Sequence, residues 1–303
     1  MEDAGAGAVV LPSLFEEQIN HETRELDFLL THGTYSYAEA LTFFAEPQLF
    51  RLTPDAYLEH VRRAKDALSI PVIGSLNGVS RGGWVSFARD IQAAGADALE
   101  LNIYFVPTDP YMAGSTIETE MVDLLSDVVA EVSIPVAVKL SPYLTNVAHM
   151  ARMLDEAGAA GLVLFNRFYQ PDIDLDTLDL VPRPTLTAAS DPQAVRLPLA
   201  WIGILYGRVR TSLAGSSGVH AARDALKLLM VGADVTMMAS ALMRHGIEHL
   251  QTVRDDLQVW LEHHEYTSVR QLRGCMSQQL VAFPSAFERA HYVRAVSASS
   301  AAP

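Results

Sequence analysis

One pattern recurs along this chain: a glycine closes a helical stretch, and a short apolar run follows it. It is clearest at 94–102, where Gly95 precedes an apolar run that ends on the polar residue Asn102. Glycine readily adopts the left-handed conformation that ends many helices, and an apolar run suits a parallel strand covered on both faces. The pattern therefore predicts a junction between a helix and a buried strand.

The same junction appears three more times, around Gly5, Gly158 and Gly232. Four similar junctions predict a repeated βα unit. The expected strands lie at about 8–13, 71–76, 97–103, 134–140, 161–166, 210–215 and 234–239. With 303 residues, half of them apolar, the chain suits an α/β fold of the (β/α)8 TIM barrel class, which takes roughly 250 residues plus insertions.

We expect a single barrel domain over 1–295, with insertions at about 14–52 and 167–198 and a disordered tail over 296–303. Pro171, Pro182, Pro184 and Pro192 argue against a long helix within 167–198. Only seven strands are counted, and the first junction begins at Met1 without a preceding helix. The pattern therefore predicts a barrel whose first strand is missing at the amino end.

Composition excludes several classes of function. The net charge of −14 leaves no basic footprint for nucleic acid or for an anionic membrane surface. The single cysteine, Cys275, rules out an internal disulfide and a cysteine-ligated cluster, and it fits a reducing compartment. No apolar run approaches the roughly 18 residues of a spanning helix, and the start does not resemble a signal peptide. We therefore expect a cytoplasmic protein with a small-molecule substrate, and neither a membrane nor a nucleic acid as partner.

Active sites of βα barrels lie at the carboxyl ends of the strands. The polar residues at those positions are Ser13, Asn77, Asn102, Lys139, Asn166 and Ser240. Lys139 is the most informative, because an ammonium group ending a buried strand is costly when unpaired. It faces an anionic or electron-accepting ligand, or acts as a Schiff-base amine, or reaches out of the barrel rim to water.

A short loop, Gly215-Ser216-Ser217-Gly218, separates an expected strand from an expected helix. Backbone N–H groups at such a position can bind phosphate, and the loop at Ala239 and Ser240 would be its neighbour. His245 and His249 share a helix face at metal-ligand spacing, but without a third ligand they predict no metal site. No G-x-G-x-x-G motif follows a strand, which argues against a nicotinamide site of the Rossmann type.

Several of these segments resemble the dihydroorotate dehydrogenases. The resemblance rests on Glu100–Asn102, Val138–Pro142, Leu164–Asn166 and the loop at 215–218. The segments 10–19 and 165–171 are similar to a bacterial branch called dihydroorotate dehydrogenase-like. Such proteins are (β/α)8 barrels that contain FMN.

The resemblance implies roles for individual residues. Lys139 and Asn102 would contact the flavin ring or the substrate, Asn166 would hydrogen-bond the substrate, and Ser13 would approach the flavin. The FMN phosphate would be held by Gly215, Ser216, Ser217, Gly218, Ala239 and Ser240, and Gly207 would contact the flavin. The implied activity is oxidation of dihydroorotate to orotate in pyrimidine biosynthesis, or of a related small anionic substrate, by a homodimer. The electron acceptor is not identified.

Two positions depart from the family pattern. The cysteine or serine that serves as the base in relatives is replaced by Phe105, and a family lysine on the strand that ends at Ser13 is replaced by Pro12. Ser115 and Thr108 could substitute for the base only if their loop folds inward. We therefore expect slow dihydroorotate oxidation. The alternatives are a Schiff-base lyase using Lys139 and a non-catalytic FMN-binding remnant or subunit.

Overall fold

The computed structural model describes residues 1–19, 53–78, 80, 82–104, 106–166, 172–181, 187–189, 191, 193–288, 293 and 297. Most of the first predicted insertion, position 105, the start of the second insertion and nearly all of the predicted tail lie outside these residues. The chain forms two compact units, over 7–138 and 139–303, and the first six residues are divided between them. We call these the amino-terminal unit and the carboxyl-terminal unit and describe each by itself.

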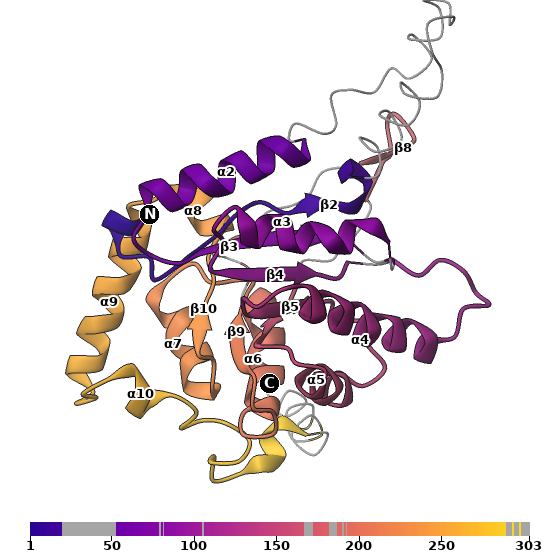
Figure 1. The fold of residues 1–303 in the computed structure, drawn as a ribbon. Helices are drawn as coiled ribbons and strands as arrows, with labels where there is room; N and C mark the ends of the chain where they lie inside the picture. Colours follow the sequence, from indigo (N-terminus) through magenta and orange to yellow (C-terminus); the bar gives the residue numbers. More distant parts are fainter. Residues whose placement is uncertain are drawn as a thin grey trace, which may run out of the picture. The chain divides into compact units, whose positions relative to one another are not determined.

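The amino-terminal unit is built from parallel strands and the helices that follow them. Its strands are β1 (Val9–Val10), β2 (Leu14–Phe15), β3 (Val72–Asn77) and β4 (Ala98–Asn102), with β1, β2 and β4 all paired to β3. Its helices are η1 (Glu2–Ala4, at the boundary of the units), α2 (Pro54–Ala67), η3 (Gly83–Ser86), α3 (Phe87–Ala93) and α4 (Gly114–Glu131). Helix α2 packs on β3 and α3 packs on β4 (Figure 1). Strand β5 (Val136–Leu140) begins in this unit and ends in the next.

The carboxyl-terminal unit repeats this arrangement. Its parallel strands β6 (Gly161–Leu164), β9 (Ser212–Gly215) and β10 (Val235–Thr236) pair in that order. The helices are α5 (Val147–Glu156), α6 (Gln193–Leu205), α7 (Ala222–Val231), α8 (Ser240–His245), α9 (His249–His263), α10 (Val269–Leu272) and η4 (Pro284–Phe287). Helix α6 packs on β6, β9 and α7, while β7 (Asp172–Asp174) and β8 (Asp179–Val181) form an antiparallel hairpin.

The predicted junctions are confirmed. Gly5, Gly95, Gly158 and Gly232 all have positive φ, between 92° and 123°. At Gly95 the N–H group donates to the carbonyl of Gln92 at 2.9 Å, which closes the helix, and β4 begins at Ala98. A residue with a β-carbon is strained at such a φ value, so these four positions explain why glycine marks each junction.

An aspartate follows two of these glycines and ties neighbouring strands together. The Asp97 carboxylate accepts the Val72 N–H at 2.7 Å and pairs with Lys65 at 2.8 Å. The hydrogen bond from Lys65 lowers the pKa of Asp97. Asp234 likewise accepts the Leu213 N–H, at 2.9 Å. Each aspartate therefore satisfies an N–H group at or beside the start of an adjacent strand, which sets the strand register.

Parallel strands that alternate with helices in both units confirm the α/β fold of the TIM barrel class. Each of the seven predicted strands is present, although β1 and β10 are shorter than expected. The segment expected as the second insertion contains the β7–β8 hairpin, and α6 begins within its expected bounds, at Gln193. Helix α6 accommodates Pro198 in its interior. Within the described residues, no helix is both long enough and apolar enough to cross a membrane.

Candidate active site

Strands β3 and β4 carry polar side chains on one face. Ser75 lies beside Glu100 and Asn77 lies beside Asn102 in the register of the two strands. All four are buried, Ser75 completely and Glu100 with 3 % of its surface exposed. Because side chains alternate along a strand, these four share a face, and the intervening residues point to the opposite one.

The opposite face of these strands packs on the helices. A β-carbon at Gly74 would lie 2.5 Å from the Ile91 side chain of α3. Leu76, Leu99 and Leu101 are fully buried. The apolar residues therefore supply the packing between sheet and helices, which leaves the polar face available for chemistry.

A break between β1 and β2 brings Ser13 to this polar face. Leu11 donates its N–H to the Ile73 carbonyl, but the ladder is interrupted at Ser13, so the next carbonyl on this edge of β3, that of Ser75, has no strand partner. Pairing resumes only at Leu14, opposite Leu76. In the gap, the Ser13 hydroxyl lies 2.7 Å from the Ser75 hydroxyl.

The hydroxyl of Tyr57, on α2, fills the same gap. It accepts the Ser75 N–H at 2.7 Å and donates to the Ser75 carbonyl at 3.1 Å. One side-chain oxygen thus replaces a strand partner for both backbone groups of Ser75. Burial raises the pKa of Tyr57 to about 12, and the charge of Glu100 adds to that rise against the backbone hydrogen bond of Ser75.

In the carboxyl-terminal unit, Lys139 and Asn166 lie near neighbouring strand ends. Lys139 is half-buried on the face of β5 opposite Val138 and Leu140. Asn166 follows β6, and its N–H donates to the Leu140 carbonyl at 2.7 Å. Both residues make further interactions. The strand ends thus bring an ammonium group and an amide to one edge of the sheet.

The loop at 215–218 leaves β9 at the same edge. The Ser216 N–H donates to the Leu164 carbonyl at 2.7 Å, and the Ser217 hydroxyl donates to the Phe165 carbonyl at 3.2 Å. Gly218 has a φ of +73°, and a β-carbon there would lie 2.6 Å from the Val195 backbone nitrogen. These contacts fix the loop through its backbone and permit only glycine at 218.

This loop presents unused backbone donors. Within the described part of the chain, the N–H groups of Ser217, Gly218 and Val219 have no hydrogen-bond acceptor. The next two N–H groups, of His220 and Ala221, donate to the Asp224 carboxylate. Three adjacent free donors fit the oxygens of a phosphate, so the loop has the chemistry that an FMN phosphate requires.

The remaining predicted residues divide into two groups. Thr236 of β10 pairs with Gly215, so Ala239 and Ser240, just after β10, lie at the same edge as the loop. Gly207 lies between α6 and the start of β9, at the opposite end of that strand. The structure therefore brings Ala239 and Ser240 to the predicted site and does not bring Gly207 there. Position 105 lies outside the described residues.

Two histidines set aside by the sequence analysis belong to a cluster behind the loop. The rings of His245 and His249 are 4.9 Å apart, and His249 Nε2 lies 2.7 Å from the His220 carbonyl oxygen. His220 is 4 % exposed, and its Nε2 lies 3.0 Å from the Thr187 hydroxyl. Burial lowers the pKa of His220. Among the described residues, no group of three or more metal-ligating side chains is placed to hold a metal ion.

Sequence reasoning did not single out Ser75 and Glu100 of the polar face, nor Tyr57 of α2, as site residues. Within the strands it considered only residues at the strand ends. The signal was present, because Ser75 and Asn77, like Glu100 and Asn102, are separated by two positions in otherwise apolar strands. That spacing places both members of each pair on one face.

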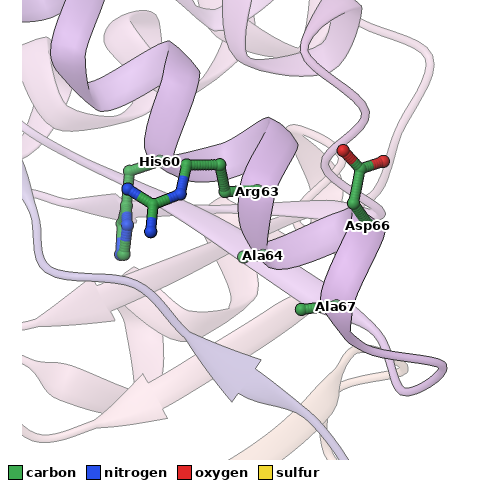
Figure 2. Close-up of a pocket in the computed structure, with 5 residues that line it drawn as sticks. All are labelled: His60, Arg63, Ala64, Asp66 and Ala67. Atoms are coloured by element: carbon green, nitrogen blue, oxygen red, sulfur yellow. The ribbon is translucent and has the colours of Figure 1, made fainter.

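A hollow of about 420 Å³ lies elsewhere, on α2. Its lining residues are His60, Arg63, Ala64, Asp66 and Ala67, and Figure 2 shows His60 beside Arg63 with Asp66 apart from them. The buried side of the same helix carries Tyr57 and Val61. The hollow is thus on the outer side of α2 and shares no residue with the strand-end positions.

Comparison with known proteins identifies the family. A family model described as dihydroorotate dehydrogenase matches residues 53–261. Among individual relatives, the putative dihydroorotate dehydrogenase A (fumarate) of Aeropyrum pernix is 27 % identical over 211 residues, which cover 68 % of this chain and 67 % of that protein. The catalytic subunit of dihydroorotate dehydrogenase B (NAD(+)) of Cutibacterium acnes is 30 % identical over 214 residues, covering 67 % and 69 %.

A third relative has a different name. The chloroplastic dihydropyrimidine dehydrogenase (NADP(+)) of Arabidopsis thaliana is 24 % identical over 207 residues, covering 63 % of this chain and 48 % of that protein. All three names denote dehydrogenases, which supports an oxidoreductase. The family match spans α2 to α9 and includes the strand-end residues from Asn77 to Ser240. On this evidence, the chain belongs to the dihydroorotate dehydrogenase family.

Proposed function

We propose that this protein is an FMN-dependent oxidoreductase that acts on a CH–CH bond of a small anionic, pyrimidine-like substrate. Dihydroorotate, oxidised to orotate in pyrimidine biosynthesis, is the first substrate to test. The observation that carries the proposal is the set of three free N–H donors at Ser217, Gly218 and Val219, which suit a phosphate and lie within the segment that matches the family. The relatives' names supply the reaction class.

Each candidate residue has a role in this proposal. The N–H groups of Ser217, Gly218 and Val219 hold the FMN phosphate, with Ala239 and Ser240 beside them. FMN, when bound, supplies a two-electron acceptor for a hydride. Lys139 provides a positive charge for the electron-rich ring or the anionic substrate.

Three amide or hydroxyl side chains complete the assignment. Asn102 and Asn166 orient the ring and the substrate through their amide groups, which can both donate and accept hydrogen bonds. Ser13 approaches the flavin from the break between β1 and β2.

The proposal leaves the electron acceptor open. Relatives are named for fumarate and for NAD(+), and one is named as a catalytic subunit, so a second protein is a reasonable route for electrons. We further propose a cytoplasmic homodimer organised as a single barrel domain.

Flavin titration and reduction test the proposal. Purified protein should be yellow or should take up one FMN per chain, and anaerobic dihydroorotate should bleach the bound flavin. Lys139→Ala should slow this bleaching about 10- to 100-fold, the usual effect of losing one charged hydrogen bond. Lys227→Ala, which removes an exposed lysine of α7, is the matched control and should leave the rate unchanged. Protein that stays colourless with excess FMN would contradict the proposal.

A further inference from the structure

The buried polar face of β3 and β4 contains a chain of hydrogen bonds with a defined direction. The Ser75 hydroxyl donates to Glu100 Oε1 at 3.3 Å. A hydroxyl has one proton, so Ser75 must accept in its 2.7 Å contact with Ser13, and Ser13 must donate. The protons therefore point from Ser13, through Ser75, to the carboxylate.

This chain of hydrogen bonds runs from a partly accessible residue to a buried one. Ser13 is half-buried, Ser75 is fully buried and Glu100 is 3 % exposed. Because Ser13 uses its proton toward Ser75, its oxygen retains lone pairs that can accept a proton from outside. Glu100, at the inner end, carries the only kind of group in this chain of three residues that can keep that proton.

The middle of the chain is held in place by its backbone. Tyr57 binds both the N–H and the carbonyl of Ser75, which fixes the Ser75 backbone opposite the break at Pro12. Asn77 and Asn102 lie two positions further along the same face, toward the carboxyl ends of the strands. Polar groups so deeply buried cost stability unless they are satisfied, and an apolar face would pack at lower cost.

From this arrangement we propose that Ser13, Ser75 and Glu100 form a proton relay for the candidate active site, with Glu100 as the terminal acceptor. The proposal rests on the oxidoreductase function proposed above, because oxidation of a CH–CH bond releases a proton as well as a hydride. Ser13 is the residue that meets the substrate side, while Ser75 and Glu100 act through it and are positioning residues.

The transfer is balanced in atoms and electrons. A substrate C–H bond breaks, and its electron pair becomes the second bond between the two carbons. The released proton forms a new O–H bond at Ser13, whose own proton passes to Ser75, and the Ser75 proton passes to Glu100 Oε1. Bound FMN would supply the oxidant that accepts the hydride lost by the adjacent carbon.

The first test measures flavin reduction by rapid mixing with dihydroorotate across pH. Glu100→Gln keeps the shape and an acceptor oxygen but cannot hold the proton, so reduction should slow by about 10² to 10⁴, the range for lost acid–base catalysis. Ser13→Ala should slow it similarly, and Ser13→Thr, which restores a hydroxyl, should recover most of the rate. FMN affinity should change little in Glu100→Gln, whose side chain is buried away from the proposed flavin contacts.

Glu156→Gln is the matched control for the glutamate variant, because Glu156 is an exposed partner of Arg152 on α5. It should keep the wild-type rate and pH profile. The relay is overturned if either Glu100→Gln or Ser13→Ala reduces the flavin at the wild-type rate and with the wild-type pH profile. Ser13→Ala changes a half-buried residue, so it remains informative if Glu100→Gln does not fold.

The second test requires no flavin. Infrared difference spectra of the protein on acidification should contain a carboxylic acid C=O band that is absent from Glu100→Gln and shifted by Ser75→Ala, which removes the hydrogen bond to Oε1. A band that is missing or insensitive to Ser75→Ala would overturn the relay. This separates the two proposals, because absence of FMN binding rejects the proposed function while the infrared result still decides whether Ser75 and Glu100 are coupled.

Discussion

The two units present polar groups in different ways, one through side chains and the other through the backbone. In the amino-terminal unit, Ser13, Ser75 and Glu100 are joined by hydrogen bonds between side chains that are partly or fully buried. In the carboxyl-terminal unit, the loop at 215–218 offers backbone N–H groups that remain unused. Side-chain networks depend on residue identity, whereas a backbone site depends on conformation, so the two regions should respond to different kinds of substitution.

Gly218→Ala is expected to have the largest effect. The substitution places a β-carbon at a φ of +73° and 2.6 Å from the α6 backbone, so the loop must move. Strain of this kind costs about 1–3 kcal/mol, and displaced donors weaken phosphate binding further, so FMN affinity should fall about 100-fold or more. Gly7→Ala is the matched control, because a β-carbon there meets nothing within 4 Å. If an FMN titration shows unchanged affinity for Gly218→Ala, the backbone conformation of this loop does not determine FMN binding, and the contrast between the two regions is wrong.

Tyr57→Phe is expected to have the next largest effect. It keeps the ring in the core but leaves the N–H and carbonyl of Ser75 without the partner that the hydroxyl supplies. Each unsatisfied buried group costs about 1–3 kcal/mol, so urea denaturation should show a loss of about 2 kcal/mol or more. Tyr111→Phe, at a residue that is 95 % exposed, should be neutral. Equal stability of the two variants would show that Tyr57 does not complete the β3 ladder.

Much of the fold could be predicted because its signals are local. The glycines at the junctions predict the positive φ values that the structure has there. Thr53 followed by Pro54 predicts the start of α2, where the Thr53 hydroxyl accepts the Ala56 N–H at 3.3 Å. The β7–β8 hairpin was missed although its sequence alternates aspartate with apolar residues, as in Asp172-Ile173-Asp174. The prolines around it argue only against a long helix.

The polar site was harder to predict because its contacts join distant parts of the sequence. Ser13 and Ser75 are 62 positions apart, and no spacing rule connects them. Tyr57 fits the apolar stripe of α2, and only the gap between β1 and β2, opposite Ser75, explains the role of its hydroxyl. Gly207 illustrates the opposite case, because family likeness assigned it to the flavin while topology puts it at the other end of β9.

His220→Gln should have the smallest effect, a change in how stability depends on pH. His220 belongs to the histidine cluster behind the loop at 215–218. Burial lowers the pKa of His220, with Arg244, His245 and His249 adding to that shift and Asp224 opposing it. Below the ordinary value of 6.5 the unfolded chain binds a proton that the folded chain resists, so stability falls as pH decreases. His220→Gln removes this difference and should flatten the fall in stability below about pH 6.5.

The measurement for His220 is the thermal midpoint as a function of pH. His60→Gln, at an exposed position on α2, should keep the wild-type slope. A His220→Gln variant with the same slope as the wild type would indicate that the cluster behind the loop does not resist protonation.

The Tyr57 hydroxyl, which takes the place of a strand partner for Ser75, affects how the amino-terminal unit unfolds locally. An ordinary strand edge frays when its neighbour peels away, but the Ser75 edge is closed by a residue of α2. Solvent can reach this edge only when the helix lifts from the sheet, so helix undocking and exposure of the Ser75 amide become one event. The break at Pro12 thereby couples α2 and β3 into a single cooperative element.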